Sequence, residues 1–91
     1  MNAANQATEV NVKGQIREFV MEHLASAKGV SSFTDQESLM DSGVIDSLGV
    51  FRVVSFLEET FNVRIADEEI SSQNLKSIDS IERLVLEKLK R

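Results

Sequence analysis

Residues 43–48 read Gly43-Val44-Ile45-Asp46-Ser47-Leu48, and this stretch decides how the chain is organised. It ends a long connection of loop-forming residues and begins the most apolar helix of the sequence. Asp46 or Ser47 can accept a hydrogen bond from the free amides of that helix, so either is a candidate N-cap. The stretch therefore predicts a serine hydroxyl that is exposed and rigidly held at the start of a helix.

Apolar residues recur at helical intervals on both sides of this stretch. The residues expected on the inner faces of the helices are Val12, Ile16, Phe19, Val20, Leu24, Ala27, Val50, Val53, Val54, Leu57, Phe61, Ile78, Ile81, Leu84, Val85 and Leu89. We predict an amphipathic helix over 9–27, a second over 47–61, a short helical turn at 67–70 and a final helix that follows Ser77, its expected N-cap. Three main helices and one short one make the predicted fold class all-α, a four-helix bundle.

The connection over residues 29–46 is long for a compact domain. Gly29 stands where a left-handed residue would end the first helix, and Phe33, Leu39 and Ile45 are expected to pin the loop to the core. A loop of this length is either functional or an ordinary connector between helices. Residues 1–8 are predicted to form a flexible tail, and residues 9–91 a single domain.

Composition and charge restrict the functions open to the chain. Its 91 residues include no cysteine, which excludes disulfides, thiolate metal sites and thiol nucleophiles. The net charge is −5, and residues 35–69 alone hold nine acids and two bases. This acidic centre disfavours nucleic acid and anionic membranes as partners and favours proteins with basic patches. With no signal-peptide pattern and no membrane-length apolar run, we expect a cytoplasmic protein.

Catalytic and metal-binding alternatives fail on spacing. A nucleophile elbow needs glycine two residues before and two after its serine, but Ile45 and Gly49 hold those positions. The only histidine, His23, lies within the apolar stripe of the first helix and is expected to have a packing role. A calcium loop beginning at Asp35 would place Met40 where glycine is required. We therefore predict no catalytic residues and no dedicated metal site.

The helix over 47–61 has apolar residues on a second face. Its main stripe faces the core, whereas Leu48, Phe51 and Ser55 fall on the opposite side, beside Arg52 and Glu59. Short helices often expose single apolar residues. The alternative is a docking patch for another protein.

The extended sequence resembles the acyl carrier protein and peptidyl carrier protein family. The resemblance covers about residues 9–90, and it is specific in residues 43–70. Its core is Asp46-Ser47-Leu48, preceded by Gly43 and followed by an amphipathic helix that ends Leu57-Glu58-Glu59-Thr60-Phe61. The order of elements also matches: a long first helix, a long loop, a helix opening at the serine, a short third helix and a final helix. The resemblance therefore implies a four-helix bundle of the acyl-carrier type.

The resemblance implies a carrier without catalytic activity of its own. Ser47 would be the covalent attachment point of 4′-phosphopantetheine, transferred from coenzyme A by a phosphopantetheinyl transferase, and its terminal thiol would hold acyl or aminoacyl groups as thioesters. Asp46 would support the transferase site. A loading ligase and downstream synthase enzymes would be the other partners of a monomeric carrier. The partner-binding residues implied are Leu48, Phe51, Arg52, Ser55, Glu58, Glu59, Glu68 and Glu69.

Departures from the family pattern indicate a specialised carrier. Carriers of general fatty-acid synthesis usually have an acid where this chain has Gly49, another where it has Arg52, and often a methionine where it has Ser55. We therefore expect a dedicated fatty-acyl, polyketide or nonribosomal-type pathway. The alternative function is an unmodified helical adaptor that binds partners through Leu48 and Phe51.

Overall fold

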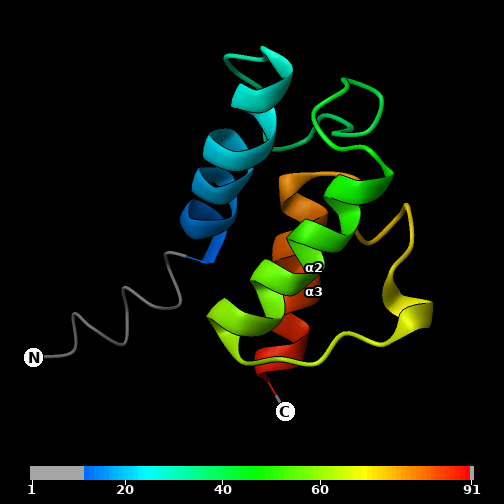
Figure 1. Ribbon diagram of the computed structural model, residues 1–91. Coiled ribbons are helices and arrows are strands. Elements are labelled where there is room, and N and C mark those ends of the chain that lie inside the picture. The colour runs from blue at the N-terminus through cyan, green and yellow to red at the C-terminus, as the bar shows by residue number, and fades with distance from the viewer. Residues whose placement is uncertain (1–11, 91) are drawn as a thin grey trace, which may run out of the picture.

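A computed structural model describes residues 12–90, and every regular element in that range is helical. The first helix covers residues 12–19 and continues as the π-helix η1 (Val20–Ala25) and the 3₁₀ turn η2 (Ser26–Lys28). It is followed by α2 (Ser47–Phe61), the 3₁₀ turn η3 (Asp67–Glu69) and α3 (Ile78–Leu89) (Figure 1). The all-α prediction is confirmed, and its short third helix is the single turn η3. The predicted tail, residues 1–8, lies outside the described residues.

The first helix packs on the core through the stripe that its sequence predicts. Val12, Ile16, Val20 and Leu24 are all buried, at intervals of four residues. The prediction that Ala27 continues this stripe is wrong, because Ala25 is buried and Ala27 is exposed. The reason is η1: its wider i→i+5 turn changes which residues share a face.

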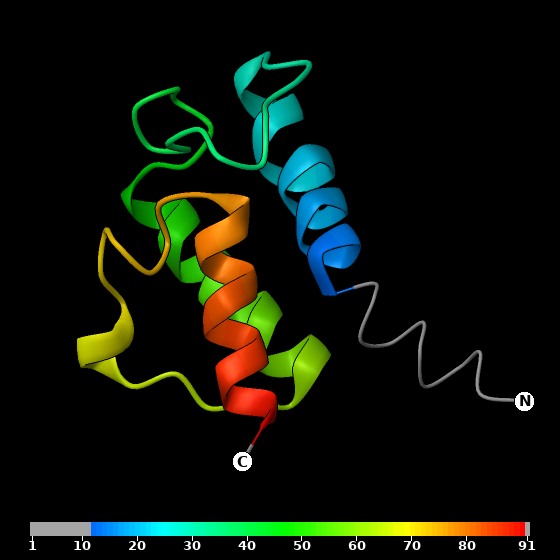
Figure 2. The ribbon, with the colours of Figure 1, turned by 180° about the vertical axis from the view of Figure 1, so that it is seen from behind.

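The loop over residues 30–46 crosses one end of the helices (Figures 1 and 2). It begins after Gly29, which has the predicted left-handed conformation with φ 74°. Its three predicted anchors, Phe33, Leu39 and Ile45, are buried. Leu39 is also fixed through its backbone, because its N–H donates to the Lys76 carbonyl at 2.8 Å and its carbonyl accepts from the Ile45 N–H at 3.0 Å. The loop is therefore an ordered part of the fold.

Helices α2 and α3 lie side by side and supply much of the remaining core (Figures 1 and 2). Val53, Leu57, Ile81 and Val85 are buried between the elements. Ser77 caps α3 as predicted, accepting a hydrogen bond from the Ser80 N–H at 3.2 Å. The sequence pattern also places Val50 and Leu89 on the inner faces of their helices. In the structure Val50 is only half-buried. Leu89 is 41% exposed, because it is the last residue of α3.

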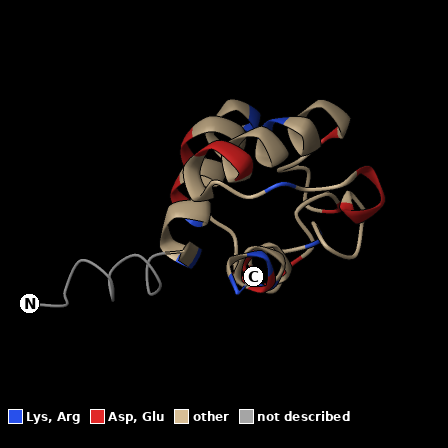
Figure 3. Cartoon of the chain, turned by 90° about the horizontal axis from the view of Figure 1, so that it is seen from below, with Lys and Arg blue, Asp and Glu red and all other residues tan. Residues whose placement is uncertain are grey.

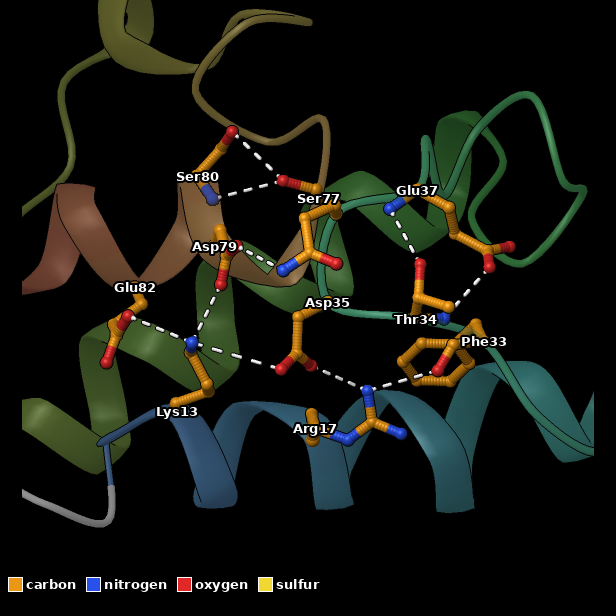
Figure 4. A network of polar contacts seen from close by, with 11 residues as sticks. Lys13, Arg17, Phe33, Thr34, Asp35, Glu37, Ser77, Asp79, Ser80 and Glu82 are labelled. Carbon is orange, nitrogen blue, oxygen red and sulfur yellow. Dashed lines mark hydrogen bonds and ion pairs between the residues drawn. The ribbon is translucent and has the colours of Figure 1, made fainter.

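A cluster of ion pairs joins the first helix, the loop and α3 (Figure 4). Lys13 Nζ lies 2.8 Å from Asp79 Oδ1 and 3.7 Å from Glu82 Oε1, while Arg17 donates to Asp35 Oδ1 at 2.7 Å. The hydrogen bond from Lys13 holds the pKa of Asp79 below its ordinary value of 3.8. The same bond raises the pKa of Lys13 above 10.5. Each group therefore stabilises the ionised form of the other.

We expect the contribution of Lys13 to stability to depend on pH. A carboxyl with a lowered pKa stabilises the fold above its unfolded value, and this stabilisation is lost as pH falls through the folded pKa. An ammonium with a raised pKa stabilises the fold below its unfolded value, and its contribution is lost as pH rises through the folded pKa. The melting temperature of Lys13→Met should therefore fall furthest below that of wild type between pH 3.8 and 10.5, with the difference shrinking outside this range.

The control for this measurement is Lys76→Met. Lys76 is exposed and has no ion pair among residues 12–90, so its removal should leave the melting temperature close to that of wild type at every pH. A pH-independent effect of Lys13→Met would instead mean that its aliphatic chain, and not its charge, stabilises the fold.

No helix within residues 12–90 is both long enough and apolar enough to cross a membrane.

Candidate functional site

Ser47 is the first residue of α2 and is exposed. Its hydroxyl has no hydrogen-bond partner within residues 12–90, and the same is true of the amides of Ser47 and Leu48. The helix dipole places partial positive charge at these amides. An anion attached to the Ser47 hydroxyl would therefore lie beside unsatisfied donors at the positive end of a helix.

Asp46 is the N-cap of α2. The sequence had left Asp46 and Ser47 as alternative candidates for this role. Its backbone is extended, with φ −110° and ψ −171°, and its Oδ1 accepts a hydrogen bond from the Gly49 N–H at 2.8 Å. The Asp46 carbonyl accepts from the Val50 N–H at 3.0 Å. Asp46 therefore satisfies the cap of α2 and leaves the Ser47 hydroxyl unused.

The Asp46 carboxylate has a second partner from the far end of the loop. Lys28, the last residue of η2, places its Nζ 2.6 Å from Asp46 Oδ2. The Lys28 hydrogen bond, followed by that of the Gly49 amide, holds the pKa of Asp46 below its ordinary value. Asp46 is thus ionised at neutral pH. One of its carboxylate oxygens accepts a hydrogen bond from the Gly49 amide of α2, and the other accepts one from the Lys28 ammonium.

Gly49 lets the carboxylate of Asp46 lie close to the helix. A Cβ at this position would approach Asp46 Oδ1 to 3.3 Å, which is tighter than an ordinary contact, and Ile45 Cγ2 to 3.4 Å, at the edge of ordinary contact. The resemblance to the carrier family marks Gly49 as a departure from the pattern of general fatty-acid carriers. The structure shows that this departure has a steric consequence. A side chain here would press on the capping carboxylate.

The outer face of α2 carries the apolar residues that the sequence places there. Leu48 is 76% exposed and Phe51 is 61% exposed. The sequence reasoning missed the two aromatic residues that complete this surface: Phe19 and Phe56 stack with their ring centroids 4.2 Å apart. Together they form a groove, which we call the α2 groove, lined by Phe19, Leu48, Phe51, Arg52, Ser55, Phe56 and Glu59.

Helical spacing alone could not assign Phe19 and Phe56 to this groove. Phe19 fits the inner stripe of the first helix, and Phe56 lies at the edge of the outer face of α2. Both are half-buried, because each ring covers the other. Only the approach of the first helix to α2 brings the two rings together.

The four glutamates predicted to contact partner enzymes differ in whether they also bind other residues of the fold. Glu59 and Glu68 are exposed and have no ion pair within residues 12–90. Glu58 accepts a hydrogen bond from the Ile65 N–H at 2.9 Å, and Glu69 binds both the Ala66 N–H and the ammonium of Lys88. Figure 3 shows the acids of η3 gathered at one edge of the molecule. Glu58 and Glu69 therefore also stabilise the fold.

His23 is exposed, with its ring centroid 5.0 Å from that of Phe19. No hydrogen bond joins its imidazole to any other residue of the described range. Nothing in this arrangement activates the Ser47 hydroxyl for nucleophilic attack.

Two comparisons with known proteins point to the same family. A family model described as a phosphopantetheine attachment site matches residues 18–85. An acyl carrier protein of Buchnera aphidicola subsp. Acyrthosiphon pisum (strain Tuc7) is 35% identical over 80 residues, covering 86% of this chain and 98% of the relative. A D-alanyl carrier protein of Streptococcus pyogenes serotype M5 (strain Manfredo) is 36% identical over 52 residues, covering 57% of this chain and 65% of the relative.

Proposed function

This chain belongs to the phosphopantetheine attachment site family and is a carrier protein without catalytic activity of its own, and from that premise we propose that Ser47 is its attachment point. One observation carries the proposal: the Ser47 hydroxyl is exposed, unbonded within residues 12–90 and held at the start of α2.

The residues around Ser47 fit a phosphodiester. The free amides of Ser47 and Leu48 and the positive end of the α2 dipole favour a negative charge at this position. The bound group supplies a terminal thiol on which acyl or aminoacyl cargo is held as a thioester. The chain itself supplies an accessible hydroxyl, a helix terminus complementary to the phosphodiester, and an ionised carboxylate at Asp46.

Asp46 has two roles in this proposal. As the N-cap it fixes the direction of α2 and with it the position of the Ser47 hydroxyl. As an ionised and partly exposed carboxylate it is available to the phosphopantetheinyl transferase, where we propose that it supports the site of transfer. Incubation with coenzyme A and a broad-specificity transferase, followed by intact-mass measurement, tests the attachment directly.

We propose that the α2 groove is the docking face for the transferase, the loading ligase and the downstream synthase enzymes. It combines exposed Leu48 and Phe51 with an aromatic floor, and Arg52 and Glu59 lie on it without ion pairs among the described residues. Exposed apolar residues bordered by charge are typical of protein interfaces. Glu68 and its neighbours on η3 would add acidic contacts to basic patches on these enzymes. A monomeric, cytoplasmic carrier remains our prediction.

Phe51→Ala should weaken docking without disturbing the fold. The ring is mostly exposed in the free chain, so its loss should cost little stability, whereas in a complex it would be buried as an aromatic anchor. We expect the KM of the transferase for the apo chain to rise roughly tenfold, which corresponds to about 1.4 kcal/mol. The control is Leu89→Ala, which removes another exposed large apolar side chain, 41% exposed against 61% for Phe51, at the end of α3. Equal KM values for the two variants would contradict docking at the α2 groove.

The specialised pathway is also a proposal. The chain has Gly49, Arg52 and Ser55 where general carriers have more acidic or longer residues. The first turns of α2 therefore present less negative charge to basic surfaces on partner enzymes. We expect general fatty-acid synthesis enzymes to turn over the loaded chain more slowly than a housekeeping carrier under identical conditions. Equal turnover would rule out this narrower function and leave the carrier role intact.

A further inference from the structure

The ion pair between Lys28 and Asp46 joins two distant parts of the chain beside Ser47. Lys28 and Asp46 are 18 residues apart in sequence, yet the Lys28 Nζ and Asp46 Oδ2 atoms lie 2.6 Å from each other. The side chains are 40% and 53% exposed, respectively. The ammonium is therefore bound to the residue that precedes Ser47, and solvent reaches both side chains of the pair.

The backbone around Lys28 is fixed by the end of the first helix. The Gly29 N–H donates to the Ser26 carbonyl at 3.2 Å, and the Val30 N–H donates to the Ala25 carbonyl at 2.9 Å. Ala25 is buried, and Gly29 has the left-handed conformation that ends the helix. The position of Lys28 is thus set by the fold, and the ion pair does not depend on a flexible segment.

The charge at this site changes when Ser47 is modified. In the unmodified chain the Lys28 ammonium and the Asp46 carboxylate form a neutral pair. A phosphodiester on Ser47 adds a second negative charge on the residue next to Asp46, and two neighbouring anions repel each other. A lysine ammonium has three N–H donors. Within residues 12–90, Asp46 Oδ2 is the one acceptor that the Lys28 ammonium binds. Two donors therefore remain for a second anion.

We propose that Lys28 is a positioning residue of the attachment site, which bridges the Asp46 carboxylate and the phosphodiester once Ser47 is modified. In this role it neutralises the added charge and keeps Asp46 in place as the cap of α2. The inference rests on the proposed function of Ser47. It adds a residue that is distant in sequence from the Asp46-Ser47-Leu48 motif.

The test compares the unmodified and modified forms of wild type, Lys28→Met, Lys28→Arg and Lys76→Met. All are prepared with coenzyme A and a broad-specificity transferase, and modification is verified by intact mass. Lys76→Met is the matched control, since it removes an exposed lysine that lies outside the α2 groove and has no ion pair within residues 12–90. We expect modification to shift the ¹⁵N resonance of the Lys28 ammonium. The ³¹P resonance of the phosphodiester should move in Lys28→Met and stay close to wild type in Lys76→Met.

Melting temperatures supply a second readout that a purely structural ion pair would not move. Lys28→Met lowers the stability of both forms by removing the contact with Asp46, so the informative quantity is the difference between the modified and unmodified forms. In wild type, we expect the melting temperature of the modified form minus that of the unmodified form to be zero or positive. In Lys28→Met, we expect this difference to be about 2–5 °C lower than in wild type. Lys28→Arg should restore the wild-type difference, because it retains the charge and the donors.

Unchanged ³¹P and Lys28 resonances in fully modified chains would overturn the role of Lys28 and leave Ser47 as the attachment point. A wild-type chain that gains no mass with an active transferase would overturn both proposals. If Lys28→Met does not fold, as judged by circular dichroism, the shift of the Lys28 resonance in wild type and the Lys28→Arg variant still decide the matter.

Discussion

Ser47→Ala is expected to abolish the coenzyme A-dependent mass gain completely. Wild type incubated with coenzyme A and a broad-specificity phosphopantetheinyl transferase should gain the mass of one phosphopantetheine group per chain, whereas the variant should gain none. The variant lacks the side-chain hydroxyl of the first residue of α2, and this hydroxyl makes no hydrogen bond within residues 12–90. Removing it should therefore change the chemistry without unfolding the chain. Intact-mass spectrometry measures the result.

The matched control is Ser72→Ala, which removes another exposed serine hydroxyl from a loop. This variant should be modified like wild type, and circular dichroism should show the same helical content for both variants. Mass gain that persists in Ser47→Ala would place the attachment elsewhere. No gain in wild type would favour the unmodified adaptor, which binds partners through Leu48 and Phe51.

Leu39→Ala is expected to destabilise the fold by about 2–5 kcal/mol. The Leu39 side chain is 0% exposed and anchors the loop that leads to Ser47. Its backbone bonds to Lys76 and Ile45 can persist in the variant, so the cost arises from lost apolar contacts and from the cavity left behind. Urea denaturation followed by circular dichroism measures the change in the free energy of unfolding.

The neighbouring residue provides the control for this prediction. Met40 is also a large apolar residue of the loop, but its side chain is 42% exposed. Met40→Ala should change the free energy of unfolding by no more than about 0.5 kcal/mol. Similar effects of the two substitutions would mean that the loop is not anchored through Leu39.

Much of the fold could be predicted from local patterns. The bounds of α2, Ser47–Phe61, follow from its apolar spacing and from the polar residues before it. The Ser77 cap and the left-handed Gly29 follow from the conformational preferences of those residue types. The errors occur near the ends of two helices: the π-turn of η1 buries Ala25 in place of Ala27, and Leu89, the last residue of α3, is 41% exposed.

The candidate site divides in the same way. Ser47, Asp46 and the outward direction of Leu48 and Phe51 could be predicted from one short stretch, because neighbours in sequence share a helix start. Glu58 and Glu69 could not be recognised as structural residues, since their partners Ile65, Ala66 and Lys88 are identified only by the path of the chain.

The sequence by itself determined that residues 12–90 fold into helices, where α2 and α3 begin, and that a serine stands at the start of the most apolar helix. These properties depend on side chains within a turn or two of one another. Only the tertiary structure decided that Asp46 and not Ser47 caps α2, that Phe19 stacks on Phe56, and that Lys28 reaches Asp46. The last two contacts join residues far apart in the chain, and their geometry depends on how the first helix and the loop pack against α2. The cap bond is local, but the sequence left it open because both side chains are able to accept it.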